Sequence, residues 1–249
     1  MDDTIRPSGA LRVSGLDLSV AGRLLLRGVN LRLDMQERVG LTGPSGIGKS
    51  TLLRAAVAGA LPHGSHWEEF FVQGGGVGYA PQAGGLLPWY SVRRNLQFFR
   101  DRRYQDIANS NGISEVAEGF GLAGILESFP YQISGGERQR VVLACVALLN
   151  PSLFIIDEPL TGVDTRMKWS CLEELSRRVA SCTAAVLVVS HDVDVLSYLC
   201  DRVVVLGDVP GRVVQEFNID YPQPRSRAHL VDSPISEART AILKWLLTN

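Results

Sequence analysis

The feature that most constrains the fold is the stretch Gly43–Thr51, which reads GPSGIGKST. Two glycines five positions apart are followed by Lys49 and Ser50, which is the P-loop pattern. An apolar run, Arg38–Thr42, precedes it, and a helix-forming run, Thr51–Ala58, follows it. The surroundings therefore predict the strand, turn and helix that such a motif requires.

The residue types of this stretch favour binding of a phosphate group. Glycines let successive backbone N–H groups turn toward phosphate oxygens, and the start of the following helix adds the positive end of its dipole. Lys49, one of only three lysines with Lys168 and Lys244, is placed to reach the β- and γ-phosphates, and the Ser50 hydroxyl to contact Mg²⁺. A glycine-rich turn with a chance lysine is the alternative. The predicted nucleotide-binding residues are Gly43, Pro44, Ser45, Gly46, Gly48, Lys49, Ser50 and Thr51.

The bulk properties limit the class of protein. The 249 residues carry a net charge of -1, so charge provides no reason to expect nucleic acid as a partner. The four cysteines show no metal-binding or redox spacing, and we expect no disulfides. The longest apolar run, Val141–Leu149, is well short of the ~20 residues that span a bilayer, and the N-terminus does not resemble a signal peptide. A cytoplasmic protein is expected.

Two regions flank the P-loop core. Apolar and polar residues alternate from Leu11 to Leu33, which predicts half-buried antiparallel strands. A short strand, Val77–Ala80, ends near Gln82, and the composition then becomes helical as far as Gln132. The basic face of the first helix there is either a partner surface or a solvated face. The helices predicted in this inserted lobe are Val92–Arg103, Ser114–Phe120 and Ala123–Phe129.

A second glycine-containing helix start occurs at Ser134-Gly135-Gly136, ahead of a helix that runs to about Leu149. It offers another candidate phosphate site. The strand Leu153–Asp157 then ends in two adjacent carboxylates. Because side chains alternate along a strand, Asp157 and Glu158 are expected to point in different directions, Asp157 toward the Mg²⁺ shell and Glu158 toward the attacking water.

The remaining core elements complete an open α/β pattern. The loop Thr161–Asp164 leads into a helix, Thr165–Val179, and the apolar strand Ala184–Val189 ends at His191. Ligands of open α/β sheets gather at the carboxyl ends of strands, so His191 is expected to contact phosphate. A strand over Val203–Leu206, a hairpin around Pro210-Gly211 and a last helix close the chain.

With these residues in hand, the sequence resembles the nucleotide-binding subunit of ATP-binding-cassette (ABC) transporters over nearly its whole length. Gly43–Ser50 is similar to the family's Walker A motif, Gln82 to its Q-loop glutamine and Ile133–Glu137 to its signature. Leu153–Asp157 with Glu158 resembles Walker B and the catalytic glutamate, Asp164 the D-loop aspartate and His191 the switch histidine.

The resemblance implies a fold and a set of roles. It implies one ABC ATPase domain over residues 1–249, an α/β P-loop NTPase core with a mixed sheet, an antiparallel β subdomain and a helical subdomain inserted at roughly 83–150. The catalytic groups are then Glu158 as base with Lys49, His191 and Gln82, and Mg²⁺ is held by Ser50, Gln82 and Asp157. ATP is bound by the P-loop and, across a dimer, by Ser134, Gly135, Gly136 and Asp164.

The resemblance also implies partners. They are a second copy or a second ABC ATPase subunit, integral membrane permease subunits and an external solute-binding protein, with the chain on the inner face of the cell membrane. The segments Leu86–Val92 and Pro210–Arg212 resemble the nitrate, sulfonate and taurine importer branch, which suggests a small anionic solute. A soluble cassette ATPase acting on DNA or ribosomes is the alternative, and a P-loop kinase or GTPase does not require the Ser134-Gly-Gly element.

One departure from the family concerns the nucleotide base. The family usually has an aromatic residue that stacks on adenine about two dozen positions before the P-loop, and Val20 occupies that position here. A valine lacks the flat ring needed for stacking. Binding is therefore expected to depend on the phosphates and to discriminate weakly between ATP and GTP.

Overall fold

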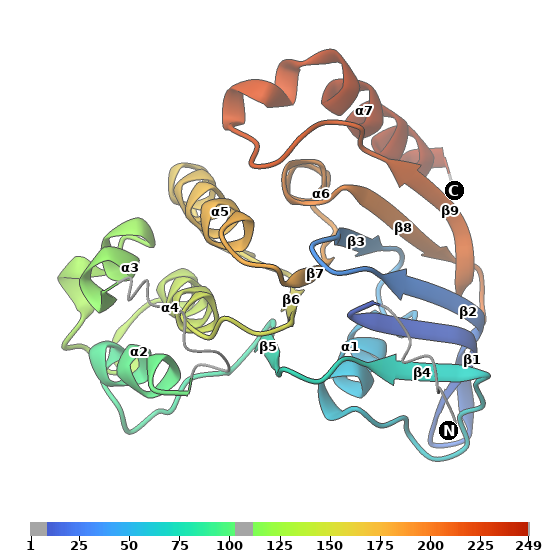
Figure 1. Ribbon diagram of the computed structural model, residues 1–249, viewed down its shortest axis with the longest axis horizontal. Helices are drawn as coiled ribbons and strands as arrows, with labels where there is room; N and C mark the ends of the chain where they lie inside the picture. The colour runs from blue at the N-terminus through green and yellow to red at the C-terminus, as the bar shows by residue number, and fades with distance from the viewer. Residues whose placement is uncertain (1–8, 103–111, 249) are drawn as a thin grey trace, which may run out of the picture.

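The computed structural model describes residues 9–102 and 112–248, and a six-stranded sheet forms the centre of this part of the chain (Figure 1). Its strand order is β5-β6-β7-β3-β8-β9, and neighbours are parallel except for the antiparallel β8–β9 pair. The sheet is therefore mixed, as predicted. Its strands are β3 (Arg38–Thr42), β5 (Val77–Ala80), β6 (Leu153–Asp157), β7 (Ala185–Val189), β8 (Arg202–Gly207) and β9 (Arg212–Asn218).

A separate three-stranded sheet, in the order β2-β1-β4, makes the predicted antiparallel subdomain. Its strands are β1 (Leu11–Val20), β2 (Arg23–Leu33) and β4 (Glu69–Val72). Ala21 and Gly22 join β1 to β2 and both have positive φ angles, 49° and 79°. Two such residues are what a tight hairpin turn between twisted strands requires.

Helices α2, α3 and α4 form the predicted helical lobe, which lies on the opposite side of the molecule from the antiparallel sheet (Figure 1). The lobe joins β5 to β6, so it is inserted between neighbouring strands of the central sheet. The described helices are α1 (Lys49–Ala58), α2 (Val92–Arg100), α3 (Ile113–Gly119), α4 (Gly135–Ala147), α5 (Thr165–Ala180), α6 (Val193–Leu199) and α7 (Ser233–Thr248), with 3₁₀ turns at Ala123–Ile125, Pro130–Gln132 and Arg227–Val231.

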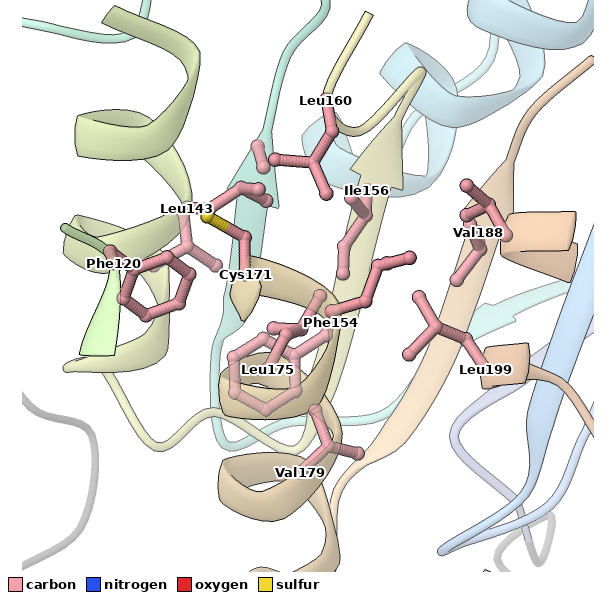
Figure 2. Close-up of a cluster of buried hydrophobic side chains, with 14 of the residues drawn as sticks. Phe120, Leu143, Phe154, Ile156, Leu160, Cys171, Leu175, Val179, Val188 and Leu199 are labelled. Carbon is pink, nitrogen blue, oxygen red and sulfur yellow. The ribbon is translucent and has the colours of Figure 1, made fainter. Parts of the chain in front are cut away.

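Two hydrophobic clusters cover the two faces of the central sheet. Along β6, Leu153 and Ile155 belong to the cluster that contains α1 and the antiparallel subdomain. Phe154 and Ile156 alternate with them and belong to the cluster shared with the helical lobe, α5 and α6. Figure 2 shows part of the second cluster, in which Leu160 lies with side chains from the lobe and the sheet. The strands are thus buried on both faces, as parallel strands usually are.

Some element boundaries differ from the predictions. The predicted helix Ala123–Phe129 is wrong, because only Ala123–Ile125 forms a 3₁₀ turn. Pro130 disfavours the α conformation at the residue before it, and Phe129 is extended, with φ −94° and ψ 157°. Helix α2 ends at Arg100, and Arg103 lies outside the described residues. Helix α6 was not predicted.

The described cysteines are all free thiols. Cys145, Cys171 and Cys200 are buried. Burial raises the pKa of the Cys171 thiol to about 12, so this thiol packs as a small neutral side chain. None of the helices that the structure describes within residues 9–102 and 112–248 combines the length and apolar character needed to cross a membrane.

Candidate active site

The strand order brings the predicted site residues together at one edge of the central sheet. Strand β7 lies between β3 and β6, and Val189 is in register with both Leu41 and Asp157. Because the three strands are parallel, the P-loop after β3, the carboxylates after β6 and His191 after β7 emerge side by side. Gln82 follows β5, the next strand beyond β6.

The P-loop itself requires glycine at its two ends. Gly43 has a φ of 141°, and a Cβ atom there would lie 2.2 Å from the carbonyl oxygen of Leu206. Gly48, with a φ of 117°, is the N-cap of α1, and no side chain caps this helix start. The first N–H groups of α1 therefore remain available to an anion.

Lys49 is buried beneath the loop that precedes it. Its Nζ donates hydrogen bonds to the carbonyl oxygens of Gly43 (2.7 Å) and Pro44 (2.9 Å). Burial lowers the pKa of Lys49, and the nearby carboxylates of Glu158 and Asp157 oppose that shift. The ammonium group is thus held against the loop by two carbonyl oxygens and interacts electrostatically with both carboxylates.

A cavity of about 1020 Å³ lies over the P-loop and the strand ends. A volume of this size accommodates a nucleotide. Gly43 and Pro44 instead line a neighbouring cavity of about 820 Å³, which His191 also borders. The predicted residues that line the larger cavity are Ser45, Gly46, Gly48, Lys49, Ser50, Thr51, Gln82, Asp157, Glu158 and His191.

Asp157 has an unused hydrogen-bonding atom that suits a cation. Its side chain is 3% exposed, and its Oδ1 atom has no hydrogen-bond partner. Burial raises the pKa of Asp157, while a hydrogen bond from Ser50 and the charges of Arg54 and Lys49 oppose that shift. A buried acceptor without a partner is costly unless another group satisfies it.

The donors around Asp157 are compatible with Mg²⁺. Across the described residues no group of three His, Cys, Asp or Glu side chains gathers as a metal site. Asp157, Ser50 and Gln82 line the same cavity, so one carboxylate, one hydroxyl and one amide oxygen are the groups that would hold a divalent ion there. Mg²⁺ typically binds in this way, through few protein ligands and a phosphate.

Glu158 differs from the prediction in its backbone. It lies beyond the end of β6 with a φ of 50°, so strand alternation does not govern its direction. Its N–H donates to the carbonyl oxygen of Val189 (2.8 Å), and Thr161 Oγ1 donates to its carbonyl oxygen (3.2 Å). Asp157 and Glu158 consequently line the same cavity. A left-handed conformation at a residue other than glycine is strained and is frequent at functional sites.

Glu158 and His191 form a pair at the mouth of the cavity. Glu158 Oε1 lies 3.4 Å from His191 Nε2, and the His191 N–H donates to Oε2 over 3.5 Å. Burial raises the pKa of Glu158, and the adjacent His191 opposes that shift. A carboxylate whose pKa is raised in this way is better suited to accept a proton than an ordinary exposed one.

The second predicted phosphate-binding segment lies outside this cavity in the described structure. Ser134 is the N-cap of α4, and its Oγ accepts a hydrogen bond from the Glu137 N–H (3.2 Å). The Glu137 carboxylate accepts hydrogen bonds from the Ser134 N–H and hydroxyl, both 2.8 Å long. Those contacts lower the pKa of Glu137. Neither Ser134, Gly135 nor Gly136 lines the cavity over the P-loop.

Of two further predicted residues, Asp164 lies beside the cavity, whereas Val20 does not line it. Asp164 caps α5 by accepting a hydrogen bond from the Met167 N–H (3.0 Å). Its neighbours Val163 and Thr165 line the cavity. Val20 is exposed at the end of β1, opposite Arg23. The weak discrimination between ATP and GTP stays a prediction, which titration of both nucleotides would test.

The structure also adds lining residues that the sequence analysis did not select. Arg54 follows Ser50 by one turn of α1 and donates to its carbonyl oxygen (3.1 Å). Lys168 and Asp192 enter the cavity from α5 and from the N-terminus of α6. The scarcity of lysine was a usable signal, because two of the chain's three lysines line this cavity.

Comparison with protein-family models decides the family. The model described as "ABC transporter" matches residues 26–161, which include the P-loop, Gln82, Ser134–Gly136 and the two carboxylates. This chain is a member of the ABC transporter family. It is accordingly an ABC ATPase, and ATP is its substrate.

Several proteins of known name resemble this ABC ATPase over most of its length. An aliphatic sulfonates import ATP-binding protein of Pseudomonas syringae is 37% identical over 210 residues, 83% of this chain and 84% of that protein. Another of the same name, from Nocardia farcinica, is 37% identical over 96% of this chain and 92% of its own length.

Solved structures agree with the fold. The structure of an ATP-binding subunit of an ABC transporter superposes with a TM-score of 0.72, at 24% identity over 94% of this chain and 99% of that one. A dimeric ATP-binding cassette in a post-hydrolysis state, bound to ADP and Pi, superposes with a TM-score of 0.68 at 21% identity, over 85% of this chain and all of that one. At such identities the likeness concerns the fold alone.

Proposed function

We propose that this ABC ATPase is the ATP-hydrolysing subunit of an import system for a small organic anion of the aliphatic sulfonate type. It works on the inner face of the cell membrane with permease subunits and an external solute-binding protein, and it does not act on nucleic acid. The observation that carries this proposal is the 37% identity, over 83–96% of the chain, to proteins named for sulfonate import.

In this proposal the site described above performs the hydrolysis. Glu158 accepts the proton of the attacking water, since it is a largely buried carboxylate with a raised pKa. His191 contacts the γ-phosphate and holds Glu158 in place. Lys49 leaves its two carbonyl partners and contacts the β- and γ-phosphates. Preorganised positive charge at the γ-phosphate stabilises the charge of the transition state.

The metal and the nucleotide complete the site. Ser50, Gln82 and Asp157 would hold Mg²⁺, and a bound Mg²⁺ would neutralise charge on the phosphate oxygens. The P-loop residues Gly43–Thr51 bind the triphosphate through their backbone N–H groups. We treat residues 1–249 as one ATPase domain with a helical subdomain at roughly 83–150.

The active form in this proposal is a dimer, made of two copies or of one copy and a second ABC ATPase subunit. Ser134, Gly135 and Gly136 of one subunit close on the γ-phosphate bound to the partner's P-loop, with Asp164 near the junction. The position of the α4 helix start outside the cavity supports this arrangement. A lone chain would leave that helix start unused.

The segment Leu87–Tyr90, which precedes α2 in the helical lobe, supports a membrane partner. Trp89 is 67% exposed, although large aromatic side chains are usually covered. The fully buried Asn95 fixes the segment: its Oδ1 accepts from the Leu87 N–H (2.8 Å), and its Nδ2 donates to carbonyl oxygens of Leu87 (3.2 Å) and Tyr90 (3.1 Å). We assign this segment to permease binding. Leu86, by contrast, packs against the lobe's own core.

The proposal can be tested with the chain expressed beside its permease. Trp89→Asp should abolish co-purification of the permease and leave the melting temperature unchanged, because an exposed side chain contributes little to the fold. Trp67→Asp is the matched control, since Trp67 is 51% exposed but lies just before β4 in the other subdomain.

Activity of the reconstituted complex then identifies the solute class. Adding solute-binding protein loaded with an aliphatic sulfonate should raise ATP hydrolysis, and the unloaded protein should not. Stimulation by DNA or ribosomes, with none by any solute, would overturn the proposal in favour of a soluble cassette ATPase.

A further inference from the structure

An ion pair that lines the nucleotide cavity joins helix α5 to the N-terminus of α6, two elements that the proposed mechanism treats separately. Lys168 Nζ contacts Asp192 Oδ2, and both residues line the cavity that holds Lys49 and Glu158. The Lys168 side chain is 16% exposed and that of Asp192 is 42% exposed, so the lysine end of the pair is largely covered and the carboxylate end is partly open to solvent.

Asp192 fixes the backbone next to His191. Its N–H donates to Ser190 Oγ (3.0 Å), and its Oδ1 accepts from the N–H groups of Asp194 (3.0 Å) and Val195 (3.3 Å), which caps α6. The two carboxylate oxygens thus have different partners, because Oδ1 holds the start of α6 and Oδ2 holds Lys168. The residue that follows His191 is therefore anchored to α6 and to α5.

Lys168 connects that anchor to the start of α5. Its N–H donates to the Asp164 carbonyl oxygen (2.8 Å), one turn back along the helix. The loop just before this turn approaches α4 closely, since a Cβ atom on Gly136 would lie 3.1 Å from the Gly162 carbonyl oxygen. Lys168 consequently ties the segment beside the Ser134–Gly136 helix start to the segment that carries His191.

The negative charge of the cavity also favours a cation at the position of Lys168. The cavity already contains the carboxylates of Asp157 and Glu158, and it must accept a triphosphate. An unpaired Asp192 carboxylate would add a negative charge beside His191. Asp194, the next carboxylate along, is paired with Arg239 at 2.5 Å, so it does not compete for Lys168.

We propose that Lys168 is a positioning residue for ATP hydrolysis, which acts through Asp192 to hold His191 against Glu158. The pair His191 Nε2–Glu158 Oε1, 3.4 Å apart, is the contact that this anchor maintains. The inference rests on the proposed roles of Glu158 and His191. It adds that Lys168 itself need not touch the nucleotide, because its ammonium group is occupied by Asp192.

The test compares Lys168→Met, Lys168→Arg and Asp192→Asn in the full chain, reconstituted with its permease. Lys168→Met should lower kcat by about tenfold, the lower end of the effect of removing an outer-shell partner of a metal-ligating histidine, because Lys168 acts on His191 only through Asp192. The Kd for ATP should stay within about twofold of the parent's. Lys168→Arg should recover most of the rate, because it keeps the charge. Lys244→Met, at an exposed position on α7, is the matched control and should change nothing.

A double variant separates an indirect role from a direct one. Asparagine still caps α6, so Asp192→Asn removes mainly the charge pair. If Lys168 acts through Asp192, the variant carrying both changes should be no slower than Lys168→Met alone. Additive losses, a Kd for ATP that rises as much as kcat falls, or an unchanged rate in Lys168→Met would each overturn the inference.

The outcome can be distinguished from failure of the proposed function. If Glu158→Gln abolishes hydrolysis while Lys168→Met does not affect it, only the positioning role is wrong. If Glu158→Gln hydrolyses at the parent rate, the assigned site itself is wrong. Should Lys168→Met fold poorly, Asp192→Asn alone supplies the test, because it must reproduce the loss of kcat.

Discussion

The starts of α1 and α4 look alike in sequence but differ in how their N–H groups are satisfied. Gly48 at the start of α1 provides no side-chain cap, and the first turn of that helix contains no acidic residue. At the start of α4, Ser134 and Glu137 cap each other, and Glu137 places a negative charge in the first turn. The α1 start therefore needs an external anion, whereas the α4 start already has an internal one.

In the proposed dimer, this difference would let the two predicted phosphate-binding segments serve one reaction. The α1 start belongs to a cavity formed by strand ends of the same chain and can bind nucleotide alone. At the α4 start, the N–H groups of Ser134 and Glu137 already have partners within the chain. In the proposed dimer, the anion that reaches this helix start is the γ-phosphate on the partner, and the contact forms only when the two subunits close.

The largest expected effect is on the rate of hydrolysis and concerns Glu158, the proposed catalytic base in the cavity over the P-loop. Glu158→Gln keeps the size and the hydrogen bonds of the side chain but cannot accept a proton, so hydrolysis should fall by about 10² to 10⁴. ATP binding should persist, and the variant should accumulate as an ATP-bound dimer. Single-turnover hydrolysis and size-exclusion chromatography with ATP measure both outcomes. An unchanged rate would remove Glu158 from the mechanism.

The next effect separates the two helix starts directly. Lys49→Ala should weaken ATP binding to the isolated chain by about ten- to a hundredfold, as expected when a charged hydrogen-bond donor is lost. Ser134→Arg should leave that binding unchanged but stop hydrolysis in the assembled complex.

Mixing the two variants sharpens this comparison. A dimer with one chain of each kind has one site carrying both changes and one site carrying neither, so it should regain activity if a single intact site suffices. Equal activity of a monomeric preparation and the assembled complex would contradict the shared site.

The smallest expected effect is on stability and concerns the Glu137 carboxylate at the N-terminus of α4. The pKa of Glu137 is lowered by its hydrogen bonds to Ser134, so the folded state favours the ionised carboxylate. Its contribution is complete above the ordinary pKa of 4.5 and is lost as the pH falls through the lowered value. An ion at a helix N-terminus contributes about 0.3–1 kcal/mol.

A charge-neutral variant tests the direction of this pH dependence of stability. Glu137→Gln can still cap the helix but does not ionise. Its stability relative to the parent, measured by urea denaturation from pH 3 to pH 7, should be lower at neutral pH and should converge with the parent's in acid. A difference that grows as the pH falls would refute the assignment.

The central parts of the fold and the cavity could be predicted because their signals are local. The P-loop, the apolar strands and the polar residues at their ends occupy short windows, and parallel strands bring their carboxyl ends to one edge. The structure agrees, because Val189 is in register with both Leu41 and Asp157.

The remaining features depend on contacts between distant segments. The left-handed backbone of Glu158 follows from a hydrogen bond to Val189, which no local pattern around Glu158 contains. Lys168 and Asp192 lie 24 positions apart and meet only because α5 and α6 pack together. Helix α6, with seven residues between two strands, is too short for a clear helical period.

Leu160 links the packing of the lobe to the chemistry. It lies two residues after Glu158, borders the nucleotide cavity and is buried in the cluster that contains Phe120 and Leu143 of the helical lobe (Figure 2). Close-packed side chains rearrange between discrete states rather than deforming smoothly. In the proposed import complex, a permease that reorients the lobe would therefore change the surroundings of Glu158, the proposed catalytic base, without touching the nucleotide. Coupling free energies are reciprocal. If the permease changes the affinity of this chain for ATP by some factor, ATP therefore changes its affinity for the permease by the same factor.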